Sequence, residues 1–259
     1  DGSVLIGDKA GYALTSGANN TAVGYLSLST NATGTGNTAV GTNALKGNGN
    51  CSHNVAVGAN SLFSTTTGTQ NISIGGSSGY TLTTSSKNIL IGHGAGNVIA
   101  AGQTTTDGTV AIGDSALTAL TTGAGNTAVG YQCLDGTNDG AVNTAVGYGS
   151  LSANCGNGNT VLGYLAGADV TGALNTLIGH QSGKDTVALT SGTSNICIGN
   201  NSRTSAADST NQIVIGDDTG GVADNSVTLG NASVTAVYMA SDSGATVHAD
   251  KYMSTTMPA

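Results

Sequence analysis

An aliphatic residue followed by glycine recurs along this chain at a nearly constant spacing, and this period restricts the fold more than any other feature. The phrase Asn-Thr-Ala-Val-Gly occupies residues 20–24 and again residues 37–41, so its two glycines stand 17 residues apart. Most steps between successive repeat glycines equal 17, and the glycines are Gly7, Gly24, Gly41, Gly58, Gly75, Gly92, Gly113, Gly130, Gly147, Gly163, Gly179, Gly199, Gly216 and Gly230. A fixed period of this length indicates a solenoid, in which each repeat forms one coil and stacks on the next.

The residues before each repeat glycine have the character of a short β-strand. The residue before the glycine is always Ile, Val or Leu, and the residue three before it is always Val, Thr or Ile. Both lie on one face of a strand, because side chains alternate with period two, and β-branched residues suit strands. The residue two before the glycine, on the opposite face, is never charged. The rest of each unit is rich in Gly, Asn, Thr and Ser, which favours turns.

We therefore expect an all-β parallel β-solenoid (β-roll) of about fourteen 17-residue coils over residues 1–230, with two short strands in each coil. Residues 231–259 depart from the repeat and are expected to form a C-terminal cap or stalk. With strands about 4.8 Å apart, the coils would make a rod about 62 Å long. The glycine content and the absence of apolar residues at helical spacing argue against helices.

A coil of this length encloses little apolar volume, which suggests that the chain packs on other copies of itself. Ordering a glycine-rich backbone costs about 1–2 kcal/mol per residue, and one narrow aliphatic column offsets little of that cost. We expect the Val, Ile and Leu column to fill the coil, and the small residues of the opposite strand face to pack on other subunits. Small side chains permit close approach around a shared axis, and we predict a homotrimer.

Composition and charge exclude several classes of function. The chain has a net charge of −8 with six Lys and Arg, whereas nucleic-acid binding needs clustered basic residues. Membrane insertion is not expected, because no apolar run approaches the roughly 18 residues of a membrane span. The four cysteines show no CxxC spacing and are predicted to be structural or free thiols, and the four histidines offer no local metal pair. We expect neither a metal nor a cofactor.

A column of aromatic residues is the best candidate for ligand binding. Tyr131, Tyr148 and Tyr164 directly follow the repeat glycine in three consecutive units, and Tyr25, His93 and His180 share their column. Stacked about 4.8 Å apart, these rings would form an aromatic strip. Aromatic faces beside amides and carboxylates are typical of sugar-binding sites, so a glycan is the expected ligand. The alternative is a packing ladder at a subunit boundary.

A second column contains asparagine in consecutive units, at Asn20, Asn37, Asn54, Asn71 and Asn88. Stacked amides can hydrogen-bond to one another along the solenoid axis. We interpret this column as a structural ladder.

Two units are longer than the others, namely the 21-residue unit that follows Gly92 and the 20-residue unit that follows Gly179. Insertions in a solenoid often map to loops on a binding side. The alternative is neutral variation in repeat length.

No catalytic constellation emerges, and we do not expect an enzyme. Residues 75–79, GGSSG, fit a nucleophile-elbow pattern, and residues 92–96, GHGAG, resemble a phosphate-binding loop, but both belong to the repeat and neither is followed by a helical pattern. Asp8 and the pair Asp217-Asp218 could bind a cation, although no calcium-binding glycine-aspartate repeat is present.

The repeats NTAVGYLSLS, NVAVGANSLF and TVAIGDSAL resemble the head repeats of trimeric autotransporter adhesins, and similar repeats occur in bacteriophage tail fibres. The resemblance covers residues 3–234 and implies a homotrimeric parallel β-roll. The stretch VTAVYMASDSGATVHADKYMSTTMPA looks like the segment that precedes an endosialidase-type intramolecular chaperone in phage fibres. Such a chaperone trimerises the fibre and is then cleaved off, which favours a viral fibre.

The expected function is a structural fibre of a virion that attaches to host-surface glycans through repeated lateral sites, located on a virion appendage or otherwise outside the cell. One alternative is a bacterial cell-surface adhesin or extracellular filament. Another is an ice-binding solenoid, because one strand column contains Thr21, Thr38, Thr127, Thr144, Thr160 and Thr176. Val and Ile fill the other eight units of that column, which indicates that it is buried. A polysaccharide-cleaving enzyme would require two carboxylates about 5–10 Å apart in a groove.

Overall fold

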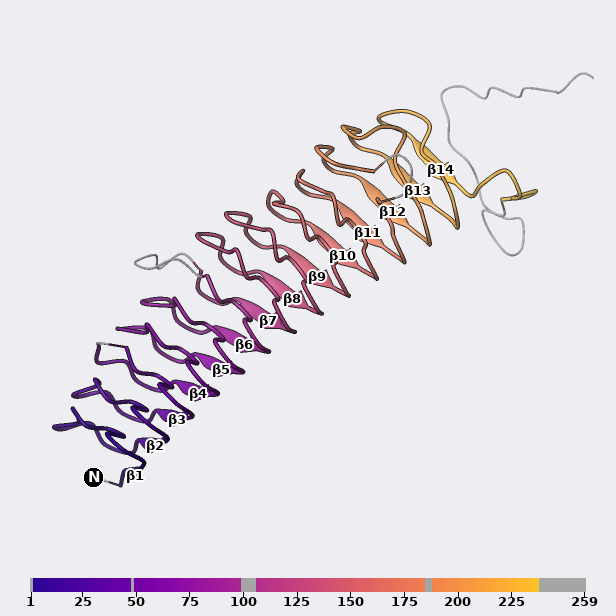
Figure 1. Cartoon of the computed structure of the whole chain (residues 1–259). Coiled ribbons are helices and arrows are strands. Elements are labelled where there is room, and N and C mark those ends of the chain that lie inside the picture. Colours follow the sequence, from indigo (N-terminus) through magenta and orange to yellow (C-terminus); the bar gives the residue numbers. More distant parts are fainter. Residues whose placement is uncertain (1, 48, 99–105, 185–187, 238–259) are drawn as a thin grey trace, which may run out of the picture.

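The computed structural model describes residues 2–47, 49–98, 106–184 and 188–237, which form one parallel sheet wound as a solenoid (Figure 1). Its strands are β1 (Val4–Ile6), β2 (Thr21–Val23), β3 (Thr38–Val40), β4 (Val55–Val57), β5 (Ile72–Ile74), β6 (Ile89–Ile91), β7 (Val110–Ile112), β8 (Thr127–Val129), β9 (Thr144–Val146), β10 (Thr160–Leu162), β11 (Thr176–Ile178), β12 (Ile196–Ile198), β13 (Ile213–Ile215) and β14 (Val227–Leu229). They pair in chain order, each in register with the next, as Thr21 pairs with Thr38. The predicted all-β parallel solenoid of about fourteen coils is confirmed.

Each coil contains one strand in the described part of the chain, and the prediction of two strands per coil is wrong. The reason is the backbone after the repeat glycine, where alternate residues are left-handed, as at Leu26 (φ 54°) and Leu28 (φ 50°). A segment with this alternation cannot extend as a strand. Backbone hydrogen bonds still join these turns between coils, as when Leu28 N–H donates to the Ala44 carbonyl at 2.9 Å.

The repeat glycine ends each strand and lets successive coils approach closely. In the first thirteen repeat glycines φ lies between 124° and 145°, a region that residues with a Cβ rarely adopt. A Cβ placed on Gly113 would also lie 2.3 Å from the carbonyl oxygen of Gly130 in the next coil. Because that neighbour is backbone, it cannot move aside, and only glycine fits.

The faces of the strand are the reverse of what we predicted. The small residue two before the glycine lies inside the coil, where Ala22, Ala39 and Ala56 are fully buried. The β-branched columns point outward, with Ile72 38% and Ile74 40% exposed. The coil interior is too narrow for a large aliphatic residue from the strand in every coil, because in six coils a buried leucine from the opposite side already occupies it.

That leucine lies four residues after the repeat glycine, and its size is matched to the strand residue of the same coil. Ala128 shares a coil with Leu134, whereas Leu177 shares a coil with Gly183. A Cβ on Gly183 would lie 2.9 Å from Leu177 Cδ1, which shows that the two positions compete for one space. We call these two positions the inner pair, and their combined volume keeps the interior close-packed.

One coil has two small residues in its inner pair, Ser73 and Gly79. The space is filled from the adjacent coils, since Leu62 and Leu90 each place a methyl carbon 2.9 Å from the position of a Cβ on Gly79. The interior is therefore packed between coils as well as within them.

The asparagine column lies inside the solenoid and links the coils by hydrogen bonds. The Asn20 side-chain oxygen accepts from the Asn37 backbone N–H at 2.9 Å, and Asn37 Nδ2 donates to the carbonyl of Cys51 at 2.9 Å. The ladder includes Asn20, Asn37, Asn54, Asn71 and Asn88, and resumes with Asn126, Asn143, Asn159, Asn175 and Asn195. Thr109 stands between the two runs, and its buried hydroxyl has no hydrogen-bond partner.

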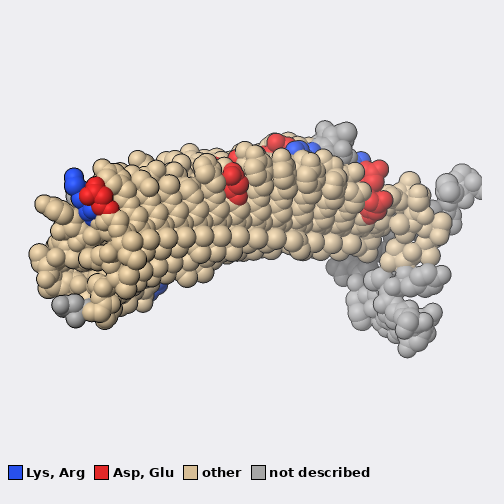
Figure 2. Space-filling view, turned by 60° about the horizontal axis from the view of Figure 1, so that its bottom comes forward, with Lys and Arg blue, Asp and Glu red and all other residues tan. Residues whose placement is uncertain are grey.

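The surface of the rod is sparsely charged. Figure 2 shows only a few acidic and basic side chains, in small groups, on the face in view, with uncharged residues covering the rest. Of the predicted C-terminal cap or stalk, residues 238–259 lie outside the described residues.

Candidate functional site

The stacking of coils brings four of the predicted aromatic residues into one continuous ladder. Ring centroids of Tyr131 and Tyr148 are 5.1 Å apart, those of Tyr148 and Tyr164 are 5.4 Å apart, and those of Tyr164 and His180 are 5.1 Å apart. The interplanar angles are 14–26°, so the rings lie nearly face to face. We call these four residues the aromatic ladder.

Polar residues continue the same column beyond both ends of the aromatic ladder. His180 Nδ1 lies 3.1 Å from the Asn200 side-chain oxygen, and Asn200 Nδ2 donates to Asp217 at 2.9 Å. At the other end, Asp114 occupies the coil before Tyr131 and lies 3.6 Å from His93 Nδ1. The column is thus a single row of stacked, exposed polar and aromatic side chains from His93 to Asp217.

This geometry changes what the ladder can offer to a sugar. Each inner ring has another ring against both of its faces, so Tyr148 and Tyr164 present only their edges and hydroxyl groups, although they are 49% and 46% exposed. Sugars stack on open ring faces, and edges with hydroxyl groups provide hydrogen bonding alone. Tyr25, 48% exposed, occupies the same column six coils from Tyr131 and does not join the ladder.

A second aromatic cluster was missed from the sequence. Phe63 and Tyr80 stack with ring centroids 4.9 Å apart and an interplanar angle of 9°, and Lys46 Nζ lies 5.5 Å from the centre of the Phe63 ring. All three occupy the fifth position after the repeat glycine in consecutive coils, so their column was visible in the alignment.

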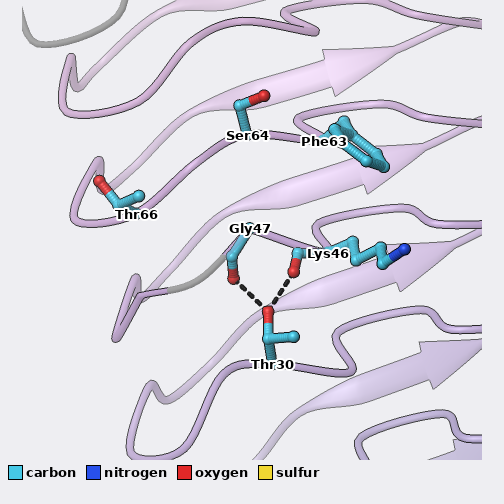
Figure 3. Close-up of a pocket in the computed structure, with 6 residues that line it drawn as sticks. All are labelled: Thr30, Lys46, Gly47, Phe63, Ser64 and Thr66. Atoms are coloured by element: carbon cyan, nitrogen blue, oxygen red, sulfur yellow. Dashed lines mark hydrogen bonds between the residues drawn. The ribbon is translucent and has the colours of Figure 1, made fainter.

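A pocket of about 310 Å³ opens beside this cluster (Figure 3). It is lined by Thr30, Lys46, Gly47, Phe63, Ser64 and Thr66. The Thr30 hydroxyl lies against the carbonyl oxygens of Lys46 and Gly47 (Figure 3). Phe63 is only partly buried, whereas its neighbour Leu62 is fully buried inside the coil. The Lys46 ammonium group and the Ser64 and Thr66 hydroxyls here can hydrogen-bond to a polar ligand such as a glycan, whereas the Phe63 ring is already stacked on Tyr80.

The motifs that could suggest catalysis form part of the repeat. Within the described residues the chain has strands and turns but no helix, so neither residues 75–79 nor residues 92–96 precede a helix N-terminus. Ser77, the central serine of residues 75–79, is half-buried, and its backbone N–H donates to the Ala59 carbonyl of the preceding coil at 2.9 Å, a contact that recurs along the repeat. Parts of both long units, residues 99–105 and 185–187, lie outside the described residues.

Metal-binding geometry is also not found where the structure describes the chain: no group of three or more His, Cys, Asp or Glu could hold an ion. Asp218 pairs with Arg203 at 2.8 Å, and Asp217 accepts a hydrogen bond from Asn200. Both carboxylates of the predicted Asp217-Asp218 pair are therefore engaged with other side chains.

The four cysteines, Cys51, Cys133, Cys155 and Cys197, are free thiols, and all are buried. Burial raises the pKa of Cys133 to about 11 and that of Cys197 to about 12. Thiols with such pKa values stay protonated at neutral pH and are poor nucleophiles.

A scan of the sequence against models of known protein families found no match, and a search of curated proteins found no similar sequence. Among the residues that the structure describes, no helix is long and apolar enough to cross a membrane.

Proposed function

We propose that this chain is a non-enzymatic, structural fibre protein that forms a homotrimer, with the outer sheet faces of three subunits packed around a shared axis. The observation that carries the proposal is the outer face itself. Its two outward columns contain Thr at six positions and Val, Ile or Leu at all the others, along all fourteen strands. A contiguous exposed apolar surface of this extent is typical of an interaction site.

The partner must match this face along its whole length, which favours another copy of the same chain. A second copy has the same spacing between coils, so its aliphatic ladder can interdigitate with the first over every strand. Full burial of each Val, Ile or Leu contributes about 1.5–3 kcal/mol, and many such contacts offset the cost of ordering a glycine-rich chain. The resemblance to trimeric adhesin heads and phage tail fibres supports three subunits.

In this proposal the fibre projects from a virion and contacts host-surface glycans through weak lateral sites that occur three times per rod. Avidity then converts weak single contacts into firm attachment. The Lys46–Phe63 pocket is the best candidate for such a site, because none of its lining residues belongs to a strand of the packed sheet. A bacterial surface adhesin or extracellular filament would use the same architecture, and the resemblance of the C-terminal segment to phage fibres favours the virion.

The proposal is tested by the solution mass of the chain and of one outer-face variant. Light scattering should give three times the 24.9 kDa chain mass for the natural sequence. Val129→Asp places a charge on the outer face and should give a monomer. Thr122→Asp introduces the same carboxylate at an exposed turn and serves as the control, which should stay trimeric. A monomeric natural protein would overturn the proposal.

One observation favours a second candidate, an ice-binding solenoid. The threonine column, which we expected to be buried, lies on the outer face, and Thr127, Thr144, Thr160 and Thr176 occupy four consecutive strands. This face is open only in a monomer. If the chain is monomeric, thermal hysteresis that is lost on Thr144→Lys substitution would establish ice binding instead of the fibre.

A further inference from the structure

Two columns of side chains border the outer sheet face, one along each edge. The leading-edge column is the residue five before the repeat glycine: Gly2, Asn19, Gly36, His53, Gln70, Lys87, Gly108, Gly125, Val142, Gly158, Leu174, Ser194, Asn211 and Asn225. The trailing-edge column is the residue after that glycine: Asp8, Tyr25, Thr42, Ala59, Gly76, His93, Asp114, Tyr131, Tyr148, Tyr164, His180, Asn200, Asp217 and Asn231. The aromatic ladder belongs to the trailing-edge column.

Within one chain the two columns do not touch. A Cβ on Gly125 would meet only Val142 within 4 Å, one on Gly158 would meet only Leu174, and one on Gly108 would meet nothing. Val142 and Leu174 belong to the same column as these glycines, so no trailing-edge atom is near. The two edges are six residues apart along a mostly extended segment, which spans up to about 20 Å.

Small residues nevertheless never occur at both edges of the same coil. All five glycines of the leading edge share a coil with a larger trailing-edge residue; the pairs are Gly2 with Asp8, Gly36 with Thr42, Gly108 with Asp114, Gly125 with Tyr131, and Gly158 with Tyr164. The two smallest trailing-edge residues, Ala59 and Gly76, share coils with His53 and Gln70. No coil has Gly or Ala at both edges.

Two aliphatic side chains of the leading edge strengthen the case. Val142 and Leu174 are each 62% exposed and adopt φ of 53° and 61°. This backbone angle belongs to the repeat turn, since every residue of the leading-edge column has a positive φ. At these two positions, however, the turn carries an aliphatic side chain that the single chain leaves mostly exposed. Both lie in coils of the aromatic ladder, opposite Tyr148 and His180.

We infer that the leading edge of one subunit packs against the trailing edge of the next, so that Val142 and Leu174 of the partner subunit cover the exposed edges of the aromatic ladder. The inference rests on the proposed homotrimer. When three sheets face a common axis, their strands run in the same rotational sense, and the end of one strand meets the start of its neighbour's strand. Closed cyclic symmetry involves no shift along the axis, so residues of equivalent coils meet. The ladder is then a subunit seam.

Thiol cross-linking between the two edges tests this arrangement. The double variant Val142→Cys/Tyr148→Cys has one thiol on each edge of one coil, and a short bismaleimide should join the chains into a covalent trimer on a denaturing gel. The four native cysteines are buried, so we do not expect them to react with the bismaleimide. Leu174→Cys/His180→Cys repeats the test two coils away. The matched control, Val142→Cys/Thr42→Cys, keeps a thiol on each edge but separates them by six coils, and should give at least tenfold less covalent trimer.

The outcomes separate the seam from the trimer. A protein that is trimeric by light scattering but gives no covalent trimer with either same-coil variant overturns the seam and leaves the proposed fibre intact. Equal cross-linking of the same-coil variant and the control also overturns it, because the edges would then lack a fixed register. A monomeric natural chain overturns the proposed function itself.

Discussion

The inner and outer faces of each strand differ in where their partners lie. On the inner face, Ala128 is fully buried and its partner, Leu134, belongs to the same coil of the same chain. On the outer face, Ile72 and Ile74 remain 38% and 40% exposed with no element of the described chain covering them. A three-residue strand thus uses its central side chain to build the coil, and its two flanking side chains remain for contacts outside the chain.

The largest loss of stability is expected from a substitution that disturbs the contact between successive coils, because both faces of the strand depend on that contact. Gly113→Ala adds a Cβ 2.3 Å from the Gly130 carbonyl at a φ of 140°, so we expect a loss of at least about 4 kcal/mol of stability. Denaturant unfolding at one fixed chain concentration measures it, because assembly makes stability depend on concentration.

Gly108→Ala is the matched control for that substitution. Gly108 also has a positive φ, 72°, but a Cβ there would meet nothing within 4 Å. We expect a loss of only about 1–2 kcal/mol, the cost of a left-handed alanine. Equal losses in the two variants would show that the backbone angle alone, and not the approach of the next coil, selects the repeat glycine.

The inner pair should respond next. Leu117 is fully buried, and Leu117→Gly should lose about 2–5 kcal/mol, as truncation of a buried leucine does. Ala111→Leu alone should also destabilise the chain by overpacking. The double variant Ala111→Leu/Leu117→Gly recreates the pairing of Leu90 with Gly96 and should recover part of the loss, with a coupling energy of about 1–3 kcal/mol. Simple additivity of the two substitutions in unfolding experiments would contradict size matching inside the coil.

The repeat could be predicted from the sequence because every coil repeats the same local requirements. Gly113 and its equivalents mark the strand ends, and the regular spacing alone gave the parallel order and the number of coils. The orientation of the strand could not be predicted from alternation, because both faces are apolar. The deciding fact was the left-handed turn that directs Leu28 inward, and hydrophobicity contains no signal for it.

The aromatic residues illustrate the same limit at the candidate site. Their common column was visible in the sequence, and the structure brings Tyr131, Tyr148, Tyr164 and His180 together. That the rings cover one another's faces depends on the coil spacing and the side-chain rotamers, which a repeat alignment does not contain. The pocket beside Phe63 depends on contacts between neighbouring coils, so it could not be predicted from the sequence either.

Buried thiols should make the inner face sensitive to alkali. Burial raises the pKa of Cys133 from 9.0 to about 11, so its contribution to stability is complete below pH 9 and is lost as the pH rises through 11. Cys133→Ser replaces the thiol with a hydroxyl group, which does not titrate in this pH range. A serine is already accommodated at the same position of the next coil, at Ser150. We expect the variant to gain about 2 kcal/mol relative to the natural protein between pH 8 and pH 11. Identical pH profiles of unfolding would show that the thiol is solvated in the folded state.

The smallest effect is expected from a substitution at Thr109, the residue that separates the two runs of the asparagine ladder. The Thr109 backbone N–H donates to the Asn88 side-chain oxygen at 2.9 Å, but the buried Thr109 hydroxyl has no partner. Thr109→Asn supplies an oxygen that can accept from the Asn126 backbone N–H, as Asn126 itself does for Asn143. One added buried hydrogen bond should raise stability by about 0.5–1.5 kcal/mol in denaturant unfolding. Thr122→Asn at an exposed turn is the control and should change nothing; a gain at both positions would point to a general effect of asparagine rather than to the ladder.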